Sequence, residues 1–418
     1  MRRERVFLGP NNSTVISGNC APDFPVSGVG AFLLVAGREH VMRSFSVGLL
    51  FSTSGPYSAL GRSALDGALM AIDEVNAAGR VQLSPVHSDP QGVPEKYESM
   101  TREMVQDGRL RHVVGGITSW SRKDVIPVLE KHGALLWYPC PYEGFECNDH
   151  VVYLGASPNQ HLVPLIDHVL ATGSRRVFLV GSNYVWGWET LRIARERLVA
   201  GGAEPTGERY LPLGETDCAH LIDEVAATGA DLIVNSLIGP SNHAFMQALS
   251  ARGQGAGAPR VVSANQTEAD LDALGPAADG MLSIGAWFET LQSEANAALS
   301  ERLAARFGAG YRASCNFATA YVAVQMLARG IERAASDEPR AVFGAVSERE
   351  HDTVLGPIAI DPLTRHTSLT PRLAVAEGGR FRILEDAGSP VVPDPYLVKT
   401  PPVSPARAAH KPALRIVS

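Results

Sequence analysis

The stretch 137–146 reads Trp-Tyr-Pro-Cys-Pro-Tyr-Glu-Gly-Phe-Glu and follows the apolar run 134–136 directly. It combines phenol rings, a thiol and carboxylates, which are groups that bind small polar molecules. Each proline fixes φ and removes a backbone donor, so we expect a rigid, extended turn at the end of a strand. Such a turn can present Tyr138 and Tyr142 in fixed directions. The chemistry it suggests is recognition of a small polar ligand.

Catalytic interpretations of this stretch are weaker. Glu143 and Glu146 could form an acid and base pair, but in a proline-rich loop their spacing does not place both on one helix face. They are expected to be solvated carboxylates or helix caps. Cys140 lacks the nearby base or helix N-terminus that a reactive thiolate needs. The chain contains no GxSxG, HExxH, Walker A or GxGxxG motif, and its histidines lack ligand spacing. We predict a non-catalytic protein with no metal site and no cofactor.

A second candidate contact region is 115–122, which reads Gly-Gly-Ile-Thr-Ser-Trp-Ser-Arg. Glycines at a strand end let the backbone approach a ligand, and the helix expected over 123–131 begins with exposed amides. Ser119 or Ser121 is expected to cap that helix, and Ser119 is also a candidate ligand contact. Arg122 opens the helix and is expected to be solvated.

The elements that position these residues alternate along the chain. Strands are expected at 47–51, 81–87, 112–117, 134–138 and 151–154, and in a second series at 177–180, 231–234, 261–262 and 281–288. The clearest helix is 59–78, which has one apolar face and ends at Gly79. Alternation of this kind indicates right-handed βαβ units. We predict an α/β fold with two doubly wound parallel-sheet lobes and a cleft between them, where the carboxyl ends of the strands meet.

The length of 418 residues suits two medium-sized cores. Lobe I is predicted to comprise 45–158 with 288–350, and lobe II to comprise 159–287 with 351–389. Residues 1–44 are expected to be a disordered leader. The proline-rich segment 390–418 is expected to be a C-terminal tail that is disordered beyond Val398.

The composition of the chain limits the partners that it is expected to bind and the cell compartment in which it is expected to work. A net charge of -7 argues against direct binding of nucleic acid. The five cysteines are scattered and contain no CxxC, which favours a reducing cytoplasm. No apolar run is long enough for a membrane span. The apolar piece 30–37 comes late and is followed by charged residues, so it makes a poor secretory signal. We predict a cytoplasmic protein, with export as the alternative.

Several motifs carry a resemblance to a known family. The segment 137–146, the triplet Pro-Asn-Gln at 158–160 and Gly-Ser-Asn-Tyr at 181–184 resemble the amide-sensing negative regulators of aliphatic amidase operons. These regulators belong to the type I periplasmic-binding-protein superfamily. The segment 393–398 resembles their C-terminal Pro-Asp-Pro-Tyr motif. In contrast, 210–214 and 235–242 are more similar to the urea and short-chain amide receptors of ABC transporters.

Strand ends and this resemblance together supply the candidate ligand contacts. They are Ser54, Ile117, Ser119, Tyr138, Cys140, Pro141, Tyr184, Trp186, Ser236 and Trp287. An ordinary turn is the alternative for Ser54, and packing at a strand–helix junction is the alternative for Tyr184 and Trp186. The resemblance implies that Ile117, Cys140 and Trp186 replace tyrosine, threonine and tyrosine. The pocket is therefore expected to be more apolar, for a larger or aromatic amide.

The resemblance implies a sensor that closes on a small neutral amide or urea-like ligand. When its ligand binds, such a sensor would change its affinity for an antiterminator-type regulatory protein and so control the expression of an amidase or nitrile-degrading operon. The alternative is the solute-binding receptor of a urea or short-chain amide ABC transporter. Assembly into a homo-oligomer stays open.

Overall fold

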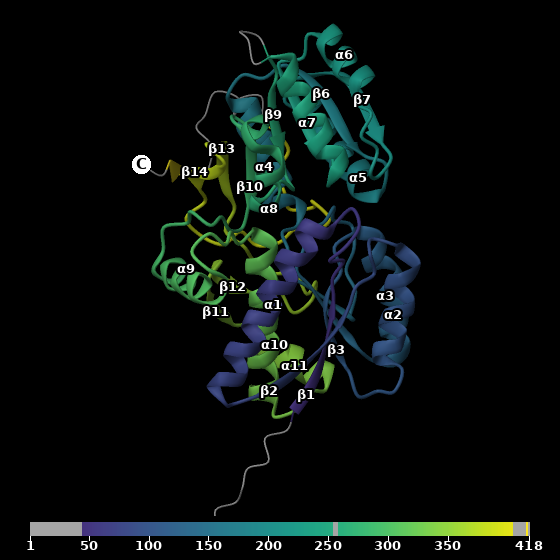
Figure 1. Ribbon diagram of the computed structural model, residues 1–418, viewed down its shortest axis with the longest axis vertical. Coiled ribbons are helices and arrows are strands. Elements are labelled where there is room, and N and C mark those ends of the chain that lie inside the picture. The colour runs from purple at the N-terminus through teal and green to yellow at the C-terminus, as the bar shows by residue number, and fades with distance from the viewer. Residues whose placement is uncertain (1–43, 254–257, 404–414, 417–418) are drawn as a thin grey trace, which may run out of the picture. The chain divides into compact units, whose positions relative to one another are not determined.

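The computed structural model describes residues 44–253 and 258–403 with their side chains, and 415–416 as backbone (Figure 1). The expected leader before Ser44 and most of the tail beyond residue 403 lie outside the described residues. The described chain folds into two lobes, each built on one sheet.

Lobe I contains a five-stranded parallel sheet in the order β2-β1-β3-β4-β5. Its strands are β1 (Ser44–Leu50), β2 (Gln82–Ser88), β3 (His112–Gly115), β4 (Leu135–Tyr138) and β5 (Val151–Tyr153). Its helices are α1 (Ser58–Ala78), α2 (Pro94–Val105), α3 (Ser119–His132), α10 (Cys315–Ala334) and α11 (Pro339–Val346). β3, β4 and β5 are buried along their whole length, as expected for parallel strands covered on both faces.

Lobe II contains an eight-stranded mixed sheet in the order β15-β14-β13-β10-β9-β8-β6-β7. The parallel strands are β6 (Arg176–Ser182), β7 (Glu204–Leu211), β8 (Leu232–Ser236), β9 (Arg260–Ser263) and β10 (Leu282–Gly285). The antiparallel strands are β13 (Arg372–Glu377), β14 (Arg380–Asp386) and β15 (Arg415–Ile416). The helices are α4 (Leu162–Ala171), α5 (Val185–Ala200), α6 (Ala219–Thr228), α7 (Pro240–Arg252) and α8 (Glu268–Leu274).

The remaining described elements connect or flank these layers. They are η1 (Pro158–Gln160), η2 (Gly275–Ala278), α9 (Glu294–Phe307), β11 (Glu350–Thr353) and β12 (Gly356–Ala359). The chain passes between the two sheets after β5, after β10 and before β13. Figure 1 shows α10 and α11, which come late in the sequence, beside α1 of lobe I.

The predicted α/β fold with two lobes is confirmed, with a difference at each edge of the lobe II sheet. At one edge β7 was not among the expected strands. The sequence predicted parallel sheets, whereas β13 pairs antiparallel with β10 and β14 pairs antiparallel with β13. The turn between β13 and β14 is made by Gly378 and Gly379 at φ values of 57° and 77°. Two successive positive φ angles match a tight hairpin turn, which returns the chain antiparallel.

Two further expectations have clear outcomes. The predicted helix 59–78 is α1, and Gly79 ends it in the left-handed region at φ 69°. The expectation of disorder directly after Val398 is wrong for the next two residues. The Asp394 carboxylate accepts hydrogen bonds from the backbone N–H groups of Lys399 and Thr400 at 2.8 and 2.7 Å, so this carboxylate organises the turn.

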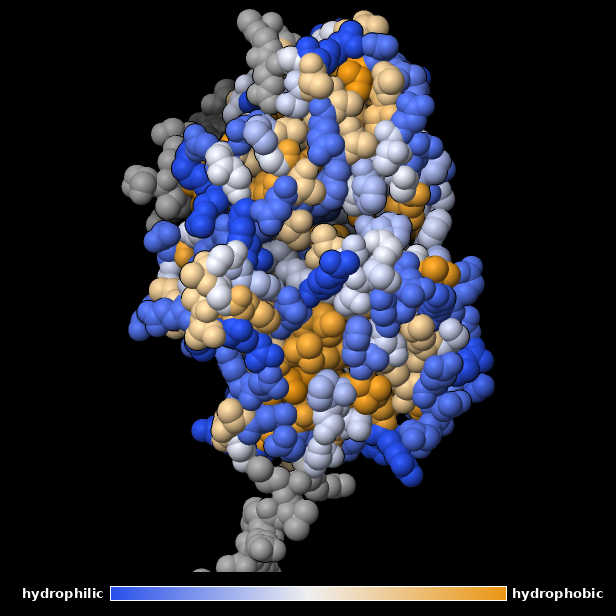
Figure 2. Space-filling model, in the orientation of Figure 1, coloured by the Kyte–Doolittle hydropathy of each residue, from blue (hydrophilic) through white to orange (hydrophobic). Residues whose placement is uncertain are grey.

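Helices α1 and α10 pack with very little space between them. A Cβ atom added to Gly67 of α1 would lie 2.3 Å from the carbonyl oxygen of Phe317 in α10. Only glycine allows this approach of the two backbones. Figure 2 shows apolar residues gathered along α1 on the face in view.

We expect Gly67→Ala to lower the free energy of unfolding by about 1–3 kcal/mol, because the added methyl group forces the two helices apart. Gly344→Ala in α11 is the matched control, because a Cβ there meets no atom within 4 Å. The control should be neutral or stabilising by up to about 1 kcal/mol. Chemical denaturation measures both, and equal effects of the two substitutions would contradict the close approach.

Candidate functional site

A cavity of about 70 Å³ lies where the carboxyl ends of the two sheets face each other. Both lobes line it, as the strand-end rule predicts. Seven of the predicted contact residues are among its lining residues: Ile117, Ser119, Cys140, Pro141, Tyr184, Trp186 and Trp287.

Three predicted contact residues do not line the cavity. The Ser54 hydroxyl donates to the Asp89 carboxylate at 2.8 Å and belongs to the turn after β1. The Tyr138 hydroxyl donates to the carbonyl oxygen of Ile117 at 3.1 Å, so this ring supports the cavity wall from behind. Ser236 is buried in β8, and its hydroxyl has no partner among the described residues.

Six polar lining residues are not among the predicted ones: His161, Asn265, Gln266, Thr267, Asn316 and Thr319. Residues 265–267 follow β9, so the same strand-end rule could have found them. His161 directly follows the Pro-Asn-Gln triplet. Asn316 comes from α10, and its Nδ2 lies 3.5 Å from Cys140 Sγ although the two are 176 positions apart. No local sequence signal marks such a contact.

Arg122 behind the cavity wall was predicted to be solvated, and this prediction is wrong. Its side chain is 0% exposed. The guanidinium carbon lies 4.9 Å from the ring centre of Tyr138 and 4.8 Å from that of Tyr142. Nη2 donates to Glu143 at 2.9 Å and Nε donates to Glu146 at 2.6 Å. The two carboxylates are therefore ion-pair partners inside the protein, and not the solvated or capping groups that the sequence suggested.

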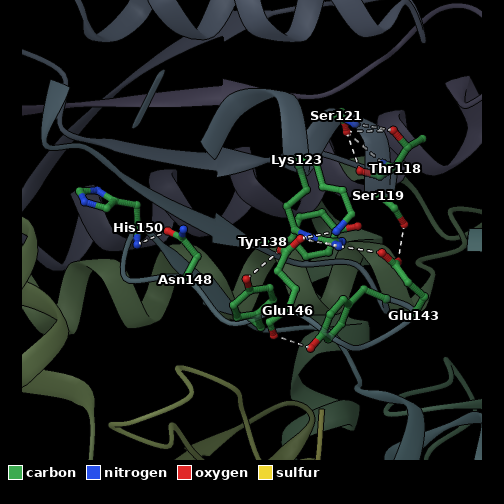
Figure 3. Close-up of polar contacts among 12 residues, drawn as sticks. Thr118, Ser119, Ser121, Lys123, Tyr138, Glu143, Glu146, Asn148 and His150 are labelled. Atoms are coloured by element: carbon green, nitrogen blue, oxygen red, sulfur yellow. Dashed lines mark hydrogen bonds and ion pairs between the residues drawn. The ribbon is translucent and has the colours of Figure 1, made fainter. Parts of the chain in front are cut away.

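The proline-rich turn explains this arrangement, because it folds the loop back onto the first turn of α3. The Ser119 hydroxyl donates to the second oxygen of Glu143 and so joins the cavity wall to the ion pairs (Figure 3). Burial alone would raise the pKa of Glu146, but Arg122 and Lys123 lower it to about 2. Glu146 is therefore ionised at neutral pH.

The cap of α3 is also different from the prediction. Thr118 is the N-cap, and its hydroxyl accepts from the Ser121 N–H at 3.1 Å. Ser121 returns the interaction, since its hydroxyl accepts from the Thr118 N–H at 3.1 Å. This reciprocal capping box satisfies the first turn without Ser119. The Ser119 side chain is then available to hold Glu143.

The network extends to the segment that returns to lobe II before β13. The Tyr153 hydroxyl donates to Glu146 at 2.8 Å. The Tyr153 ring stacks on His366 with centroids 4.1 Å apart and planes 2° from parallel. Tyr142 packs on both rings. The loop behind the cavity is thus fixed to β5 and to the interlobe segment.

The thiols at the cavity are poor nucleophiles. Burial raises the pKa of Cys140 and of Cys315 to about 12, so both are protonated at neutral pH. Cys140 Sγ donates to the carbonyl oxygen of Gly116 at 3.5 Å. A protonated, buried thiol acts as a small apolar wall group.

The described lining of the cavity contains no aspartate, glutamate, lysine or arginine. Its one histidine, His161, is neutral at pH 7, because burial lowers its pKa to about 4. Among the described residues no group of three acidic, histidine or cysteine side chains could hold a metal ion. The surface offered to a ligand is therefore uncharged.

The two lobes are in contact at the cavity. The Tyr184 ring of lobe II packs edge-on against Trp120 of α3, with centroids 5.6 Å apart. Gly239, at the start of α7, comes so near to lobe I that an added Cβ would lie 2.4 Å from the Pro56 carbonyl oxygen. The two lobes therefore touch at these two places.

Two lobes with a ligand-sized cavity at their facing strand ends define a two-lobed binding protein of type I architecture. Over residues 45–402 the chain matches the family described as Periplasmic binding protein domain, and it belongs to this family. The family includes solute-binding receptors of ABC transporters, to which the chain is related. In the described part of the chain, no helix has the length and apolar character needed to cross a membrane.

Individual relatives agree with this assignment. A Leu/Ile/Val-binding protein of Rhizobium johnstonii is 26% identical over 346 residues, which cover 80% of this chain and 92% of that protein. The solute-binding protein of an ABC transporter from R. palustris, solved in complex with benzoate, superposes with a TM-score of 0.77 at 18% identity, covering 84% and 98% of the two chains. LivJ from Streptococcus pneumoniae, solved with isoleucine, gives a TM-score of 0.72 at 19% identity, covering 81% and 98%. The two structures are similar in fold alone, and none of the three relatives is described as a regulator.

The buried ion pairs predict a large loss of stability on removal of the cation. Arg122→Met leaves the carboxylates of Glu143 and Glu146 without their main partner, so the free energy of unfolding should fall by about 3–5 kcal/mol. Arg80→Met is the control, because Arg80 is 73% exposed in its ion pair with Glu332. The control should change stability by less than about 1 kcal/mol. Urea denaturation measures the free energy of unfolding of both variants. A similarly small decrease in both would show that the ion pairs of Arg122 do not stabilise the fold.

A second carboxyl group near the cavity has the opposite character to Glu146. Glu268 opens α8, directly after Thr267 of the cavity wall, and is 1% exposed. Its Oε1 accepts from the Glu289 N–H at 2.8 Å, and its Oε2 has no partner among the described residues. Burial raises the pKa of Glu268 to about 8. The group is therefore mostly protonated at pH 7.

This shift predicts a pH dependence of stability. The folded protein holds the Glu268 proton more tightly than the unfolded chain does, so the Glu268 contribution favours unfolding increasingly as the pH rises from 4.5 to about 8. The largest slope is about 1.4 kcal/mol per pH unit. Glu268→Gln should remove this decline of stability with pH and should be more stable than the parent protein at pH 8. Glu301 is exposed, so the control Glu301→Gln should show the same decline as the parent protein. Chemical denaturation at pH 5 and pH 8 measures the free energy of unfolding of each variant. If it falls with pH in Glu268→Gln as steeply as in the parent protein, the raised pKa is not that of Glu268.

Proposed function

We propose that this protein is the solute-binding receptor of an uptake system for a small uncharged solute of the amide or urea class. The observation that carries the proposal is the uncharged lining of the cavity between the lobes. Its relatives are named as binding proteins, and one solved relative is named as the solute-binding protein of an ABC transporter, which supports the receptor class. The amide-sensing regulator suggested by the sequence motifs becomes the second candidate.

The composition of the wall supports an uncharged ligand. Ile117, Ile238 and Trp287 provide apolar surface, and Asn316 and Gln266 provide amide groups. A free α-amino acid carries an ammonium and a carboxylate, and burying them without opposite charges is costly. An amide or urea needs only neutral hydrogen-bonding partners. The relatives that bind leucine, isoleucine, valine or benzoate by name thus share the fold, and this chain is proposed to use it for another solute.

The size of the cavity supports a short chain on the ligand. Its volume of about 70 Å³ is less than half of the ~150 Å³ known to hold benzene in a protein core. The sequence alone suggested a larger or aromatic amide. The closed cavity favours acetamide, propionamide or urea over benzamide.

Receptor function would follow from closure of the lobes. A ligand that contacts both walls binds the closed form better than the open form, and only that difference shifts the equilibrium. The contacts of Tyr184 with Trp120 and of Gly239 with Pro56 would form on closure. A transport partner could then recognise the closed form. This role requires export, so we propose a periplasmic location in place of the cytoplasmic one.

One observation favours the second candidate. The Pro393–Tyr396 segment, which resembles the C-terminal motif of the amidase regulators, packs on the loop behind the cavity. The Phe145 N–H donates to the Pro395 carbonyl oxygen at 2.9 Å. A regulatory protein that binds this segment could sense the state of the loop. In that case the protein stays in the cytoplasm and pairs with an antiterminator-type partner.

Titration calorimetry and thermal unfolding of the purified full chain test the proposal. We expect acetamide, propionamide or urea to bind and to stabilise the fold by about 2.7 kcal/mol at one hundred times the dissociation constant. Leucine and benzoate at equal concentration should leave the melting temperature unchanged.

Stabilisation by leucine or benzoate without stabilisation by amides would overturn the ligand class. Cell fractionation separates the two candidate roles. Recovery in the periplasm supports the receptor, and recovery in the cytoplasm together with a regulatory protein supports the sensor.

A further inference from the structure

Two residues of the cavity wall have buried ring nitrogens without partners. His161 precedes α4 and Trp186 lies in the first turn of α5, both in lobe II and both lining the cavity. His161 Nδ1 and Trp186 Nε1 have no hydrogen-bond partner among the described residues. The two rings are 5.8 Å apart between centroids. Most buried polar atoms are paired, so two unpaired ones at one cavity indicate a ligand group that pairs with them.

The hydrogen-bonding character of each nitrogen follows from its surroundings. His161 Nε2 lies 3.1 Å from the carbonyl oxygen of Tyr142. A carbonyl oxygen can only accept, so Nε2 carries the hydrogen. Because the ring is neutral at pH 7, Nδ1 has a free lone pair and is an acceptor. The indole Nε1 of Trp186 can only donate. Two neighbouring rings of lining residues thus carry one unpaired acceptor and one unpaired donor, both buried.

The chain contains a second pair of the same kind for comparison. His112 and Trp137 lie in the core of lobe I with ring centroids 6.2 Å apart, and neither lines the cavity. His112 Nε2 lies 3.0 Å from the Asp337 carbonyl oxygen, so this ring has the same tautomer as His161. There Trp137 Nε1 donates directly to His112 Nδ1 at 3.2 Å. The two rings of the core pair hydrogen-bond to each other, whereas the two rings at the cavity do not.

We propose that His161 Nδ1 and Trp186 Nε1 together bind one ligand group that presents an N–H donor beside a C=O acceptor. The ligand N–H donates to His161, and Trp186 donates to the ligand carbonyl oxygen. A primary amide or urea has this pair of groups, whereas a carboxylate or a ketone offers acceptors alone. This inference rests on the proposed function and identifies the residues that set its specificity. Thr267, whose hydroxyl also lacks a partner, can donate or accept and so adds no preference.

Acetamide and acetone make a matched pair of probes, because they differ by an NH₂ group in place of a CH₃ group. Calorimetry on the full chain should show acetamide binding about tenfold more tightly than acetone, the worth of one well-placed hydrogen bond. His161→Phe should weaken acetamide about tenfold and leave acetone nearly unchanged, because acetone does not use the acceptor. Trp186→Phe should weaken both probes, because both use the donor.

His112→Phe and Trp137→Phe are the matched controls from the core pair. They should lower the melting temperature and leave the ratio of acetamide to acetone affinity at its parent value. If the parent protein binds acetone as tightly as acetamide, or if His161→Phe keeps the preference, the inference is overturned and the proposed function stands. The parent comparison needs no variant, so poor folding of a variant does not prevent the test. If neither probe binds while leucine or benzoate does, the inference and the proposed function both fail.

Discussion

The cavity depends on one buried cation. Arg122 lies between Glu143 and Glu146 and against the faces of two tyrosine rings, and no part of it reaches solvent. Burying a charge is expensive unless opposite charges and hydrogen bonds surround it, so this arrangement tolerates few alternatives. It fixes the proline-rich loop against α3 and holds Ser119 in the cavity wall. The position of the lobe I wall is therefore tied to the partners of one buried charge.

The same interaction explains why the cavity is neutral. Arg122 lies behind the wall and does not line the cavity. Its charge is compensated there by the carboxylates of Glu143 and Glu146. Glu268 stands behind the opposite wall and keeps its proton at neutral pH. Ionisable side chains lie behind the walls of the cavity, whereas the described side chains that line it are apolar or polar without a charge. Relatives that share this fold bind different solutes by name, so the choice of ligand in this fold depends on the side chains that line the cavity and not on the fold.

Buried polar pairs in this molecule are of two kinds, complete and incomplete. His112 and Trp137 complete each other inside lobe I, and the reciprocal cap of Thr118 and Ser121 does the same at the start of α3. At the cavity the same residue types remain incomplete. Interiors rarely keep such groups unpaired, because each one costs about 1–3 kcal/mol. An incomplete pair beside a closed cavity therefore has a different meaning from a complete pair in a core.

The sequence alone determined the alternation of strands and helices in the two lobes and the sheet edge that carries the site. Helix α1 with its terminal Gly79, strands β1 to β6 and strands β8 to β10 follow from local periodicity and from glycine chemistry. The seven lining residues follow from the rule that parallel strands bind ligands at their carboxyl ends, together with the resemblance to the amide-sensing regulators. Only the tertiary structure decided the burial of Arg122, the approach of Asn316 to Cys140 and the antiparallel edge of lobe II. It also showed that burial lowers the pKa of His161 and that its Nδ1 has no partner among the described residues. Each of these depends on residues that are distant along the chain, where spacing and periodicity carry no signal, or on the dielectric surroundings that packing creates.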